Sequence, residues 1–137
     1  MDHVLQVAAL PIRRDTDGTC RVLLVTSRET QRWIIPKGWP QPRQEDHAAA
    51  AQEALEEAGV LGTANAESIG SYEYQKRRRR GAVAVRVTVY LLAVTEELAD
   101  WPERQQRERA WFTPAEAADK VDEPELRDLL LQTSWHP

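Results

Sequence analysis

The sequence predicts an α/β domain, and three stretches carry the prediction. Ala82 to Val94 alternates between aliphatic and other side chains with the period of two that is typical of a strand. Asp46 to Ala58 is rich in alanine, leucine and glutamate and ends at a glycine, which is typical of a helix. Thr113 to Glu116 is a capping box with proline at the first helical position, so a second helix begins there. A strand-rich chain with helices at its centre and end favours layers of sheet and helix.

The first third of the chain predicts three strands. Val4 to Ile12 is apolar apart from one glutamine and has the pattern of a buried strand. Asp15 to Gly18 is a turn signal, after which Arg21 to Thr26 forms the partner strand. Trp33 to Ile35 is a short strand that ends before Pro36, since a proline biases the preceding residue toward extended geometry.

After the central helix the pattern predicts strands again. Glu67 to Tyr74 is a candidate strand, and Gln75 to Gly81 is expected to be a basic turn leading into the long strand at Ala82. Asp122 to Glu125 resembles a second helix start, and Leu126 to Leu131 follows as an apolar helical run.

Composition limits the possible classes of function. A chain of 137 residues with 42% hydrophobic residues suggests one domain, residues 1–137, with a real core. The net charge of −4 offers no bulk attraction for nucleic acid, which we do not expect as a partner. A single cysteine, Cys20, excludes an internal disulfide and a cysteine-based zinc site. The sequence contains neither an apolar stretch of membrane-spanning length nor a signal-peptide pattern, so we expect a cytoplasmic protein without membrane association.

Three carboxylates share one face of the central helix. Glu53, Glu56 and Glu57 stand at positions i, i+3 and i+4, where they repel one another. A hard divalent cation would relieve the repulsion, because Mg²⁺ prefers oxygen ligands. A solvated acidic face is the alternative. The opposite face is expected to pack on the sheet through Ala48, Ala51, Ala54, Leu55 and Ala58.

The stretch from Gly38 to Val60 resembles the motif of the Nudix hydrolases. That motif is Gly, five residues, Glu, seven residues, then Arg-Glu-aliphatic-any-Glu-Glu-any-Gly-aliphatic. This chain matches it at Gly38, Glu53, Ala54, Glu56, Glu57, Gly59 and Val60. The chain departs from the motif at Gln44 and Gln52, which stand where the family has Glu and Arg. Two amides leave no unpaired charge and can still form hydrogen bonds, and Glu45 is an alternative for the missing glutamate.

The resemblance implies a fold, a cofactor and a reaction. The fold is an α/β/α sandwich around a central mixed sheet, and the reaction is attack of water on a diphosphate linkage with Mg²⁺, or alternatively Mn²⁺, as cofactor. Glu53, Glu56 and Glu57 would hold the metal together with the Gly38 carbonyl. One glutamate is also a candidate general base, with Glu56 or Glu57 preferred. Glu103 and Glu108 are alternatives outside the motif.

Further segments resemble the diphosphoinositol polyphosphate phosphohydrolase branch. They are Trp101 to Glu103, Arg107 to Phe112, and the Trp33 to Lys37 approach to the motif. The substrates that this resemblance implies are nucleoside polyphosphates, dinucleoside polyphosphates or diphosphoinositol polyphosphates. Removal of a 5′ diphosphate from RNA and a nucleotide-sensing domain without hydrolysis are alternatives. The sequence leaves the substrate and the oligomeric state open.

Three basic residues are candidates for substrate binding. Lys37 lies next to the motif glycine and can meet a phosphate, with a solvated lysine as the alternative. Arg78, within the run Arg77 to Arg80, can attract a polyanion or stand as part of a solvated hairpin tip. Arg86 lies in the middle of a strand, where a charge needs either an ion-pair partner or a ligand. The aromatic residues Trp33, Tyr72 and Tyr74 could stack on a base, but packing in the core or at its rim is preferred.

Overall fold

The computed structural model describes residues 4–137 and contains eight strands and three helices within that range. The strands are β1 (Val4–Arg14), β2 (Cys20–Thr26), β3 (Trp33–Ile34), β4 (Lys37–Gly38), β5 (Val60–Ala64), β6 (Gly70–Arg78), β7 (Gly81–Glu97) and β8 (Arg109–Phe112). The helices are α1 (Asp46–Ala58), α2 (Pro114–Lys120) and α3 (Pro124–Leu131). The α/β fold class predicted from the sequence is therefore confirmed.

The strands form one mixed sheet with the order β3-β2-β1-β7-β5. β1 and β7 are parallel central strands, with Val4 opposite Val85 and Ile12 opposite Ala93, and the other pairs are antiparallel. On its other edge β1 pairs first with β4 and then with β2. This arrangement inserts the Lys37–Gly38 segment into the sheet beside its central strand.

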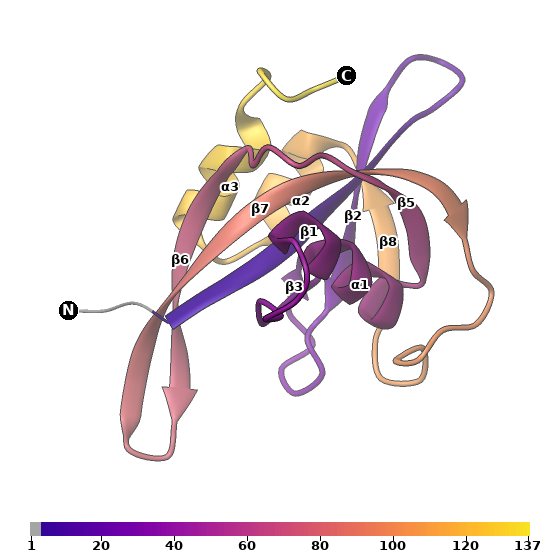
Figure 1. Cartoon of the computed structure of the whole chain (residues 1–137). Coiled ribbons are helices and arrows are strands. Elements are labelled where there is room, and N and C mark those ends of the chain that lie inside the picture. Colours follow the sequence, from indigo (N-terminus) through magenta and orange to yellow (C-terminus); the bar gives the residue numbers. More distant parts are fainter. Residues whose placement is uncertain (1–3) are drawn as a thin grey trace.

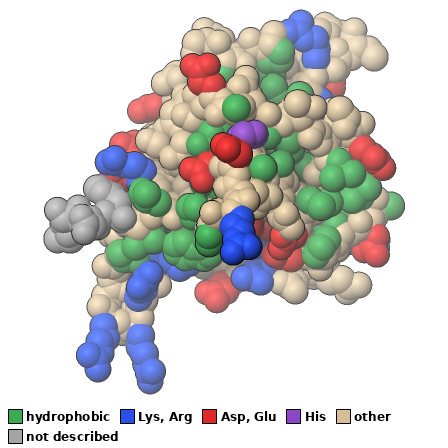
Figure 2. Space-filling view, in the orientation of Figure 1, with side chains coloured by type: hydrophobic (Ala, Val, Ile, Leu, Met, Phe, Trp, Pro, Cys, Tyr) green, Lys and Arg blue, Asp and Glu red, His purple; other side chains and the backbone are tan. Residues whose placement is uncertain are grey.

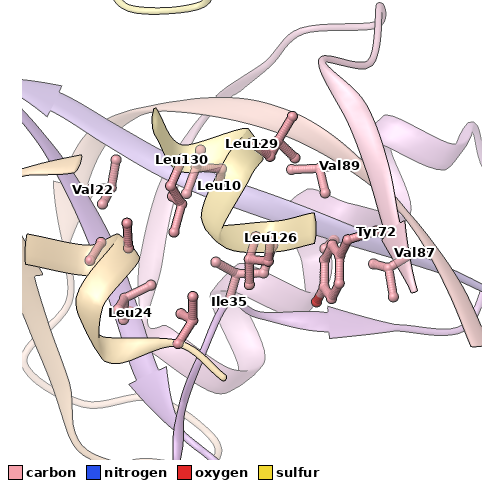
Figure 3. Close-up of a cluster of buried hydrophobic side chains, with 14 of the residues drawn as sticks. Leu10, Val22, Leu24, Ile35, Tyr72, Val87, Val89, Leu126, Leu129 and Leu130 are labelled. Carbon is pink, nitrogen blue, oxygen red and sulfur yellow. The ribbon is translucent and has the colours of Figure 1, made fainter. Parts of the chain in front are cut away.

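Helices cover both faces of the sheet (Figure 1). α1 packs on one face through its alanines, which meet Val7, Ala9, Leu23 and Val25 of β1 and β2. α2 and α3 pack on the other face, where Leu126, Leu129 and Leu130 contact a cluster that includes Leu10 and Tyr72 (Figure 3). The two apolar layers account for the unbroken burial of residues 6–12 in β1, because side chains on both faces of this strand are covered. The arrangement is the expected sandwich around a mixed sheet.

Several boundaries differ from those expected. The candidate strand at Glu67 to Tyr74 begins only at Gly70 and continues to Arg78, so part of the expected basic turn is strand and only Arg79 and Arg80 connect β6 to β7. Strands β5 and β8 were not predicted. Both are short and obtain their hydrogen bonds from distant strands, since β5 pairs with β7 and β8 with β2.

The buried face of α1 is rotated from the expected one. Its buried residues are Ala49, Ala50, Ala54, Glu57 and Ala58, whereas Ala48, Ala51 and Leu55 are only partly buried. The expectation placed all the carboxylates opposite the packed face and was wrong for Glu57. This glutamate faces inward because the inserted strand β4 lies beside α1 and supplies a polar backbone that meets it.

None of the helices in residues 4–137 is both long and apolar enough to cross a membrane. The cytoplasmic location and the single-domain organisation stay predictions.

Candidate active site

Strand β4 brings a backbone segment against the carboxylates of α1. Gly38 pairs with Val7 of β1 and is buried directly beside Glu53. A Cβ atom at position 38 would overlap the Glu53 carboxyl group, so any side chain there would displace this carboxylate. The absence of a side chain leaves the backbone of residue 38 next to a carboxylate that is about half-buried.

Glu57 is the most deeply buried of the three glutamates. Its side chain is 8% exposed, and its Oε1 accepts a long hydrogen bond of 3.4 Å from the backbone N–H of Lys37. Burial raises the pKa of Glu57 to about 8, although the nearby Arg107 guanidinium acts in the opposite direction. Burial also raises the pKa of Glu53, which is hydrogen-bonded to Glu57 and repelled by Glu56. Desolvation is the main cause of both shifts, so the folded site without a ligand disfavours the charged forms of Glu53 and Glu57.

Arg107 connects this cluster to a fourth carboxylate. Its guanidinium lies 3.8 Å from Glu57 and 2.7 Å from Glu103, and it donates to the carbonyl of Thr26 at 3.0 Å. The backbone N–H of Glu103 donates to the carbonyl of Glu56, which fixes the loop against α1. Glu103 is thus brought to the site, whereas Glu108 is exposed and bonds through its backbone to Thr26.

The donor set suits a hard divalent cation. Glu53, Glu56 and Glu57 offer carboxylate oxygens, and Gly38 lies so close to the Glu53 carboxyl group that its backbone carbonyl is a further candidate ligand. Among residues 4–137, however, no three His, Cys, Asp or Glu side chains already stand in the arrangement of a metal site. Arg107 lies between Glu57 and Glu103 and supplies the local positive charge.

A cavity of about 570 Å³ opens along the outer side of α1. Its walls include Glu53, Glu56, Arg43 and the two residues that depart from the motif, Gln44 and Gln52. No hydrogen bond joins these two glutamines in the part of the chain that the structure describes, although both line the same cavity. Sequence reasoning gave Arg43 no role, because an isolated arginine in a proline-rich loop carries no pattern.

The end of α1 is held by residues far along the chain. Gly59 adopts a left-handed conformation, with φ of 66°, and the ring of Trp101 packs where its side chain would be. Trp101 Nε1 donates to the carbonyl of Glu57 at 3.1 Å, and Arg109 donates to the carbonyl of Ala58 at 2.8 Å. These bonds satisfy carbonyls that a helix end leaves unpaired and fix the turn that carries Glu57. Trp101 belongs to a segment that the resemblance identified, but its role could not be derived from sequence.

The three predicted substrate-binding residues lie in different places. Lys37 is next to Glu57, and burial lowers its pKa while that carboxylate acts to raise it. Arg86 forms an ion pair of 2.8 Å with Glu73, which supplies the partner that a mid-strand charge needs. Arg78 is exposed at the end of the β6–β7 hairpin, and Figure 2 shows the cations of this hairpin projecting away from the body of the molecule. The structure brings only Lys37 into contact with the carboxylates.

The three aromatic candidates also lie in different surroundings. Tyr72 is 1% exposed and belongs to the core, and Trp33 packs edge-on against Phe112 with ring centroids 5.3 Å apart. Tyr74 is partly buried, and its hydroxyl donates to Gln6 at 2.8 Å. The preferred expectation of core and rim packing is confirmed for Tyr72 and Trp33.

Comparisons with known proteins give consistent matches. The model of the NUDIX domain matches residues 3–132. "Nudix hydrolase 16, mitochondrial" of Arabidopsis thaliana is 32% identical over 91% of this chain and 76% of its own length. The human "Diphosphoinositol polyphosphate phosphohydrolase 3-beta" is 40% identical over 70% of this chain, and the match spans only 57% of that relative. Among solved structures, a C. elegans Ap4A hydrolase in a binary complex superposes with a TM-score of 0.68 at 21% identity, covering 93% of this chain and 92% of the other.

Proposed function

The chain belongs to the NUDIX family, and from that membership we propose that it catalyses the metal-dependent hydrolysis of a diphosphate linkage. Family, fold class and enzyme class, a Nudix hydrolase, agree with the predictions made from the sequence. The proposed substrates are nucleoside polyphosphates, dinucleoside polyphosphates or diphosphoinositol polyphosphates. The names of the human relative and of the C. elegans structure support these last two classes.

The observation that carries the proposal is the packing of Glu53 and Glu57 beside Gly38 and Lys37. Two half-buried or buried carboxylates share this site, and burial raises the pKa of each. Such an arrangement is unfavourable without a ligand, and a divalent cation such as Mg²⁺ or Mn²⁺ would compensate it. When bound, the cation would polarise a phosphoryl oxygen and lower the pKa of a water molecule.

The residues of the chain have separate roles in this proposal. Glu53, Glu56 and Glu57 hold the cation with the Gly38 carbonyl, and Lys37 meets a phosphate of the substrate as a point charge. Glu56 or Glu57 is the preferred general base. Glu103 is the alternative outside the motif, because Arg107 holds its carboxylate beside the cluster at 2.7 Å. Arg78 and Arg86 remain candidate substrate contacts, Arg78 through long-range attraction of a polyanion.

The test is hydrolysis of diphosphate compounds with and without Mg²⁺ or Mn²⁺. Glu53→Gln and Glu57→Gln are each expected to lower kcat by at least ~10², on the scale of losing one strong electrostatic group at an active site. Glu67→Gln is the matched control, because this glutamate is exposed and lies outside both the motif and the glutamate cluster. Activity close to that of the wild type in both site variants, or full activity in excess EDTA, would contradict the proposal.

Removal of a 5′ diphosphate from RNA is the second candidate function. It is favoured by the run Arg77 to Arg80, which is exposed at the end of the β6–β7 hairpin and can meet a phosphate backbone. An assay with triphosphorylated and monophosphorylated RNA of the same sequence distinguishes it, since only the former should release diphosphate or phosphate.

A further inference from the structure

The cavity of about 570 Å³ beside α1 contains a cation that the folded chain does not use. Its walls are the loop residues 41–44 and, from α1, Ala49, Gln52, Glu53 and Glu56. Among residues 4–137, the guanidinium group of Arg43 forms neither an ion pair nor a hydrogen bond, and its side chain is exposed. Arg107, by contrast, is paired with Glu103 at 2.7 Å. Arg43 is therefore free to bind a ligand in this cavity.

The two residues that depart from the Nudix motif line the same cavity. Gln44 and Gln52 carry neutral amides, so no carboxylate at position 44 competes for the neighbouring Arg43. Neither amide group has a hydrogen-bond partner in the part of the chain that the structure describes. Each amide offers two N–H donors, and the guanidinium group offers five. The cavity thus brings together unused donors from the loop and from the helix, which is what an anion requires.

The charge of the cavity depends on the cation proposed for the glutamate cluster. Without that cation, the walls carry the two carboxylates of Glu53 and Glu56 and the one guanidinium of Arg43, which is an acidic excess. A divalent cation held by the glutamates reverses the sign of this excess. A phosphate group in the cavity would then lie between the cation and Arg43, with attraction from both.

A neighbouring cavity sets the outer limit of this anion site. It measures about 490 Å³ and shares Pro42, Arg43 and Gln44 with the first cavity, but its other walls include Glu45 and Asp46. Their two carboxylates repel any phosphate that extends past the guanidinium group. The space suited to an anion therefore ends at Arg43, and it suits one phosphate group beyond those at the cation.

We propose that this cavity is a phosphate subsite, in which Arg43, assisted by the amides of Gln44 and Gln52, binds the phosphate group adjoining the diphosphate linkage at the glutamate cluster. The inference rests on the proposed diphosphate hydrolysis and narrows its substrates to compounds with at least three consecutive phosphate groups. It favours nucleoside and dinucleoside polyphosphates over diphosphoinositol polyphosphates, whose phosphate chains contain two groups. Arg43 determines specificity in this assignment and takes no part in bond cleavage.

Calorimetry in Mg²⁺ with two uncleavable anions tests the subsite without turnover. Imidodiphosphate has two phosphorus centres, and diimidotriphosphate has three. The wild type should bind the three-phosphorus anion about 10- to 100-fold more tightly, the usual worth of a hydrogen bond to a charged group. Arg43→Gln should lose most of this preference and bind imidodiphosphate within about twofold of the wild type. Arg43→Lys should keep only part of it, because an ammonium group does not form the bidentate contact of a guanidinium with phosphate.

Arg14→Gln is the control, because it removes an exposed arginine of β1 that lines neither cavity. It should bind both anions as the wild type does, and the comparison between proteins cancels the Mg²⁺ that each anion binds in solution. Equal losses in Arg14→Gln and Arg43→Gln would reduce the effect to overall charge and overturn the inference. A wild type without preference for the three-phosphorus anion, or an Arg43→Gln variant that keeps the preference or loses both anions equally, would overturn it as well.

Kinetics with a nucleoside diphosphate, triphosphate and tetraphosphate separate the subsite from the proposed function. In Arg43→Gln, KM should rise about tenfold for the triphosphate and by no more for the tetraphosphate, with kcat within about twofold. If no compound is hydrolysed but Arg43→Gln weakens the binding of diimidotriphosphate alone, the proposed hydrolysis fails and the subsite stands. If hydrolysis occurs and Arg43→Gln binds both anions like the wild type, the subsite fails alone.

Discussion

Replacing Glu57 by Gln should change how the stability of the metal-free protein depends on pH. The pKa of Glu57 is raised from 4.5 to about 8 in the folded state, so the folded chain binds this proton more tightly than the unfolded chain does. The stability that proton binding at Glu57 gives the folded state is fully present below about pH 4.5 and is lost as the pH rises through about 8. At roughly 1.4 kcal/mol for each tenfold change in proton affinity, the loss is at most about 5 kcal/mol.

Glu57→Gln removes the titrating group and keeps its shape. The variant should resemble the wild type near pH 5 and exceed it in free energy of unfolding by a few kcal/mol near pH 9. The gain is reduced because Arg107, 3.8 Å away, loses one of its two carboxylate partners. The pKa of Glu53 is also raised in the folded state, so the free energy of unfolding depends on pH in both proteins. Only the difference in unfolding free energy between the two proteins reports on Glu57.

The assay is urea unfolding in EDTA at several values between pH 5 and 9, with Glu67→Gln as the exposed control. Saturating Mg²⁺ should then stabilise the wild type more than Glu57→Gln, because a ligand that binds only the folded state adds to its stability. If the unfolding free energies of the two proteins differed by the same amount at every pH between 5 and 9, the assignment of Glu57 as a destabilised buried carboxylate would be refuted.

Three further predictions concern other parts of the site. Gln44→Glu combined with Gln52→Arg should stabilise by at most ~1 kcal/mol, and a double-mutant cycle by chemical unfolding without coupling would show that these cavity-lining positions do not pair. Replacing Arg78 and Arg79 by Ala should raise KM for long polyphosphates at low salt more than for a short diphosphate, with kcat unchanged. KM values that match those of the wild type at every chain length would identify a solvated hairpin. Gly59→Ala should destabilise by more than ~1 kcal/mol, because a side chain there meets the Trp101 ring at a φ of 66°. Gly18→Ala, with φ of 85° and no neighbour within 4 Å, isolates the backbone part of that cost in a thermal melt.

The sequence predicted those elements whose signals are local. The helix at Asp46 to Ala58 was placed correctly at both ends, since its composition and its terminal Gly59 lie within the element itself. The capping box at Thr113 was also correct, and both of its reciprocal hydrogen bonds form. Strand β8 was missed because it depends on pairing with β2, more than 80 residues earlier in the chain.

The candidate site was predicted as a set of residues but not as an arrangement. The spacing of the glutamates identified the helix face, yet the burial of Glu57 depends on β4, a two-residue strand with no recognisable pattern. Arg107 had no sequence signal of its own, because a buried charge looks like any surface charge in one sequence. The proposed metal and substrate contacts stay predictions.

The parallel pairing of β1 with β7 has a consequence for how the chain reaches its native state. Val4 faces Val85, so the middle of the sheet closes only after about 80 residues have been synthesised beyond its first strand. Contacts of such high sequence separation carry a large loop-closure entropy and slow folding. On the ribosome, β1 and β2 emerge as a hairpin in which one edge of β1 stays unpaired until β7 arrives and one apolar face stays uncovered until α2 and α3 follow. During this interval the nascent chain is most exposed to aggregation and to chaperones.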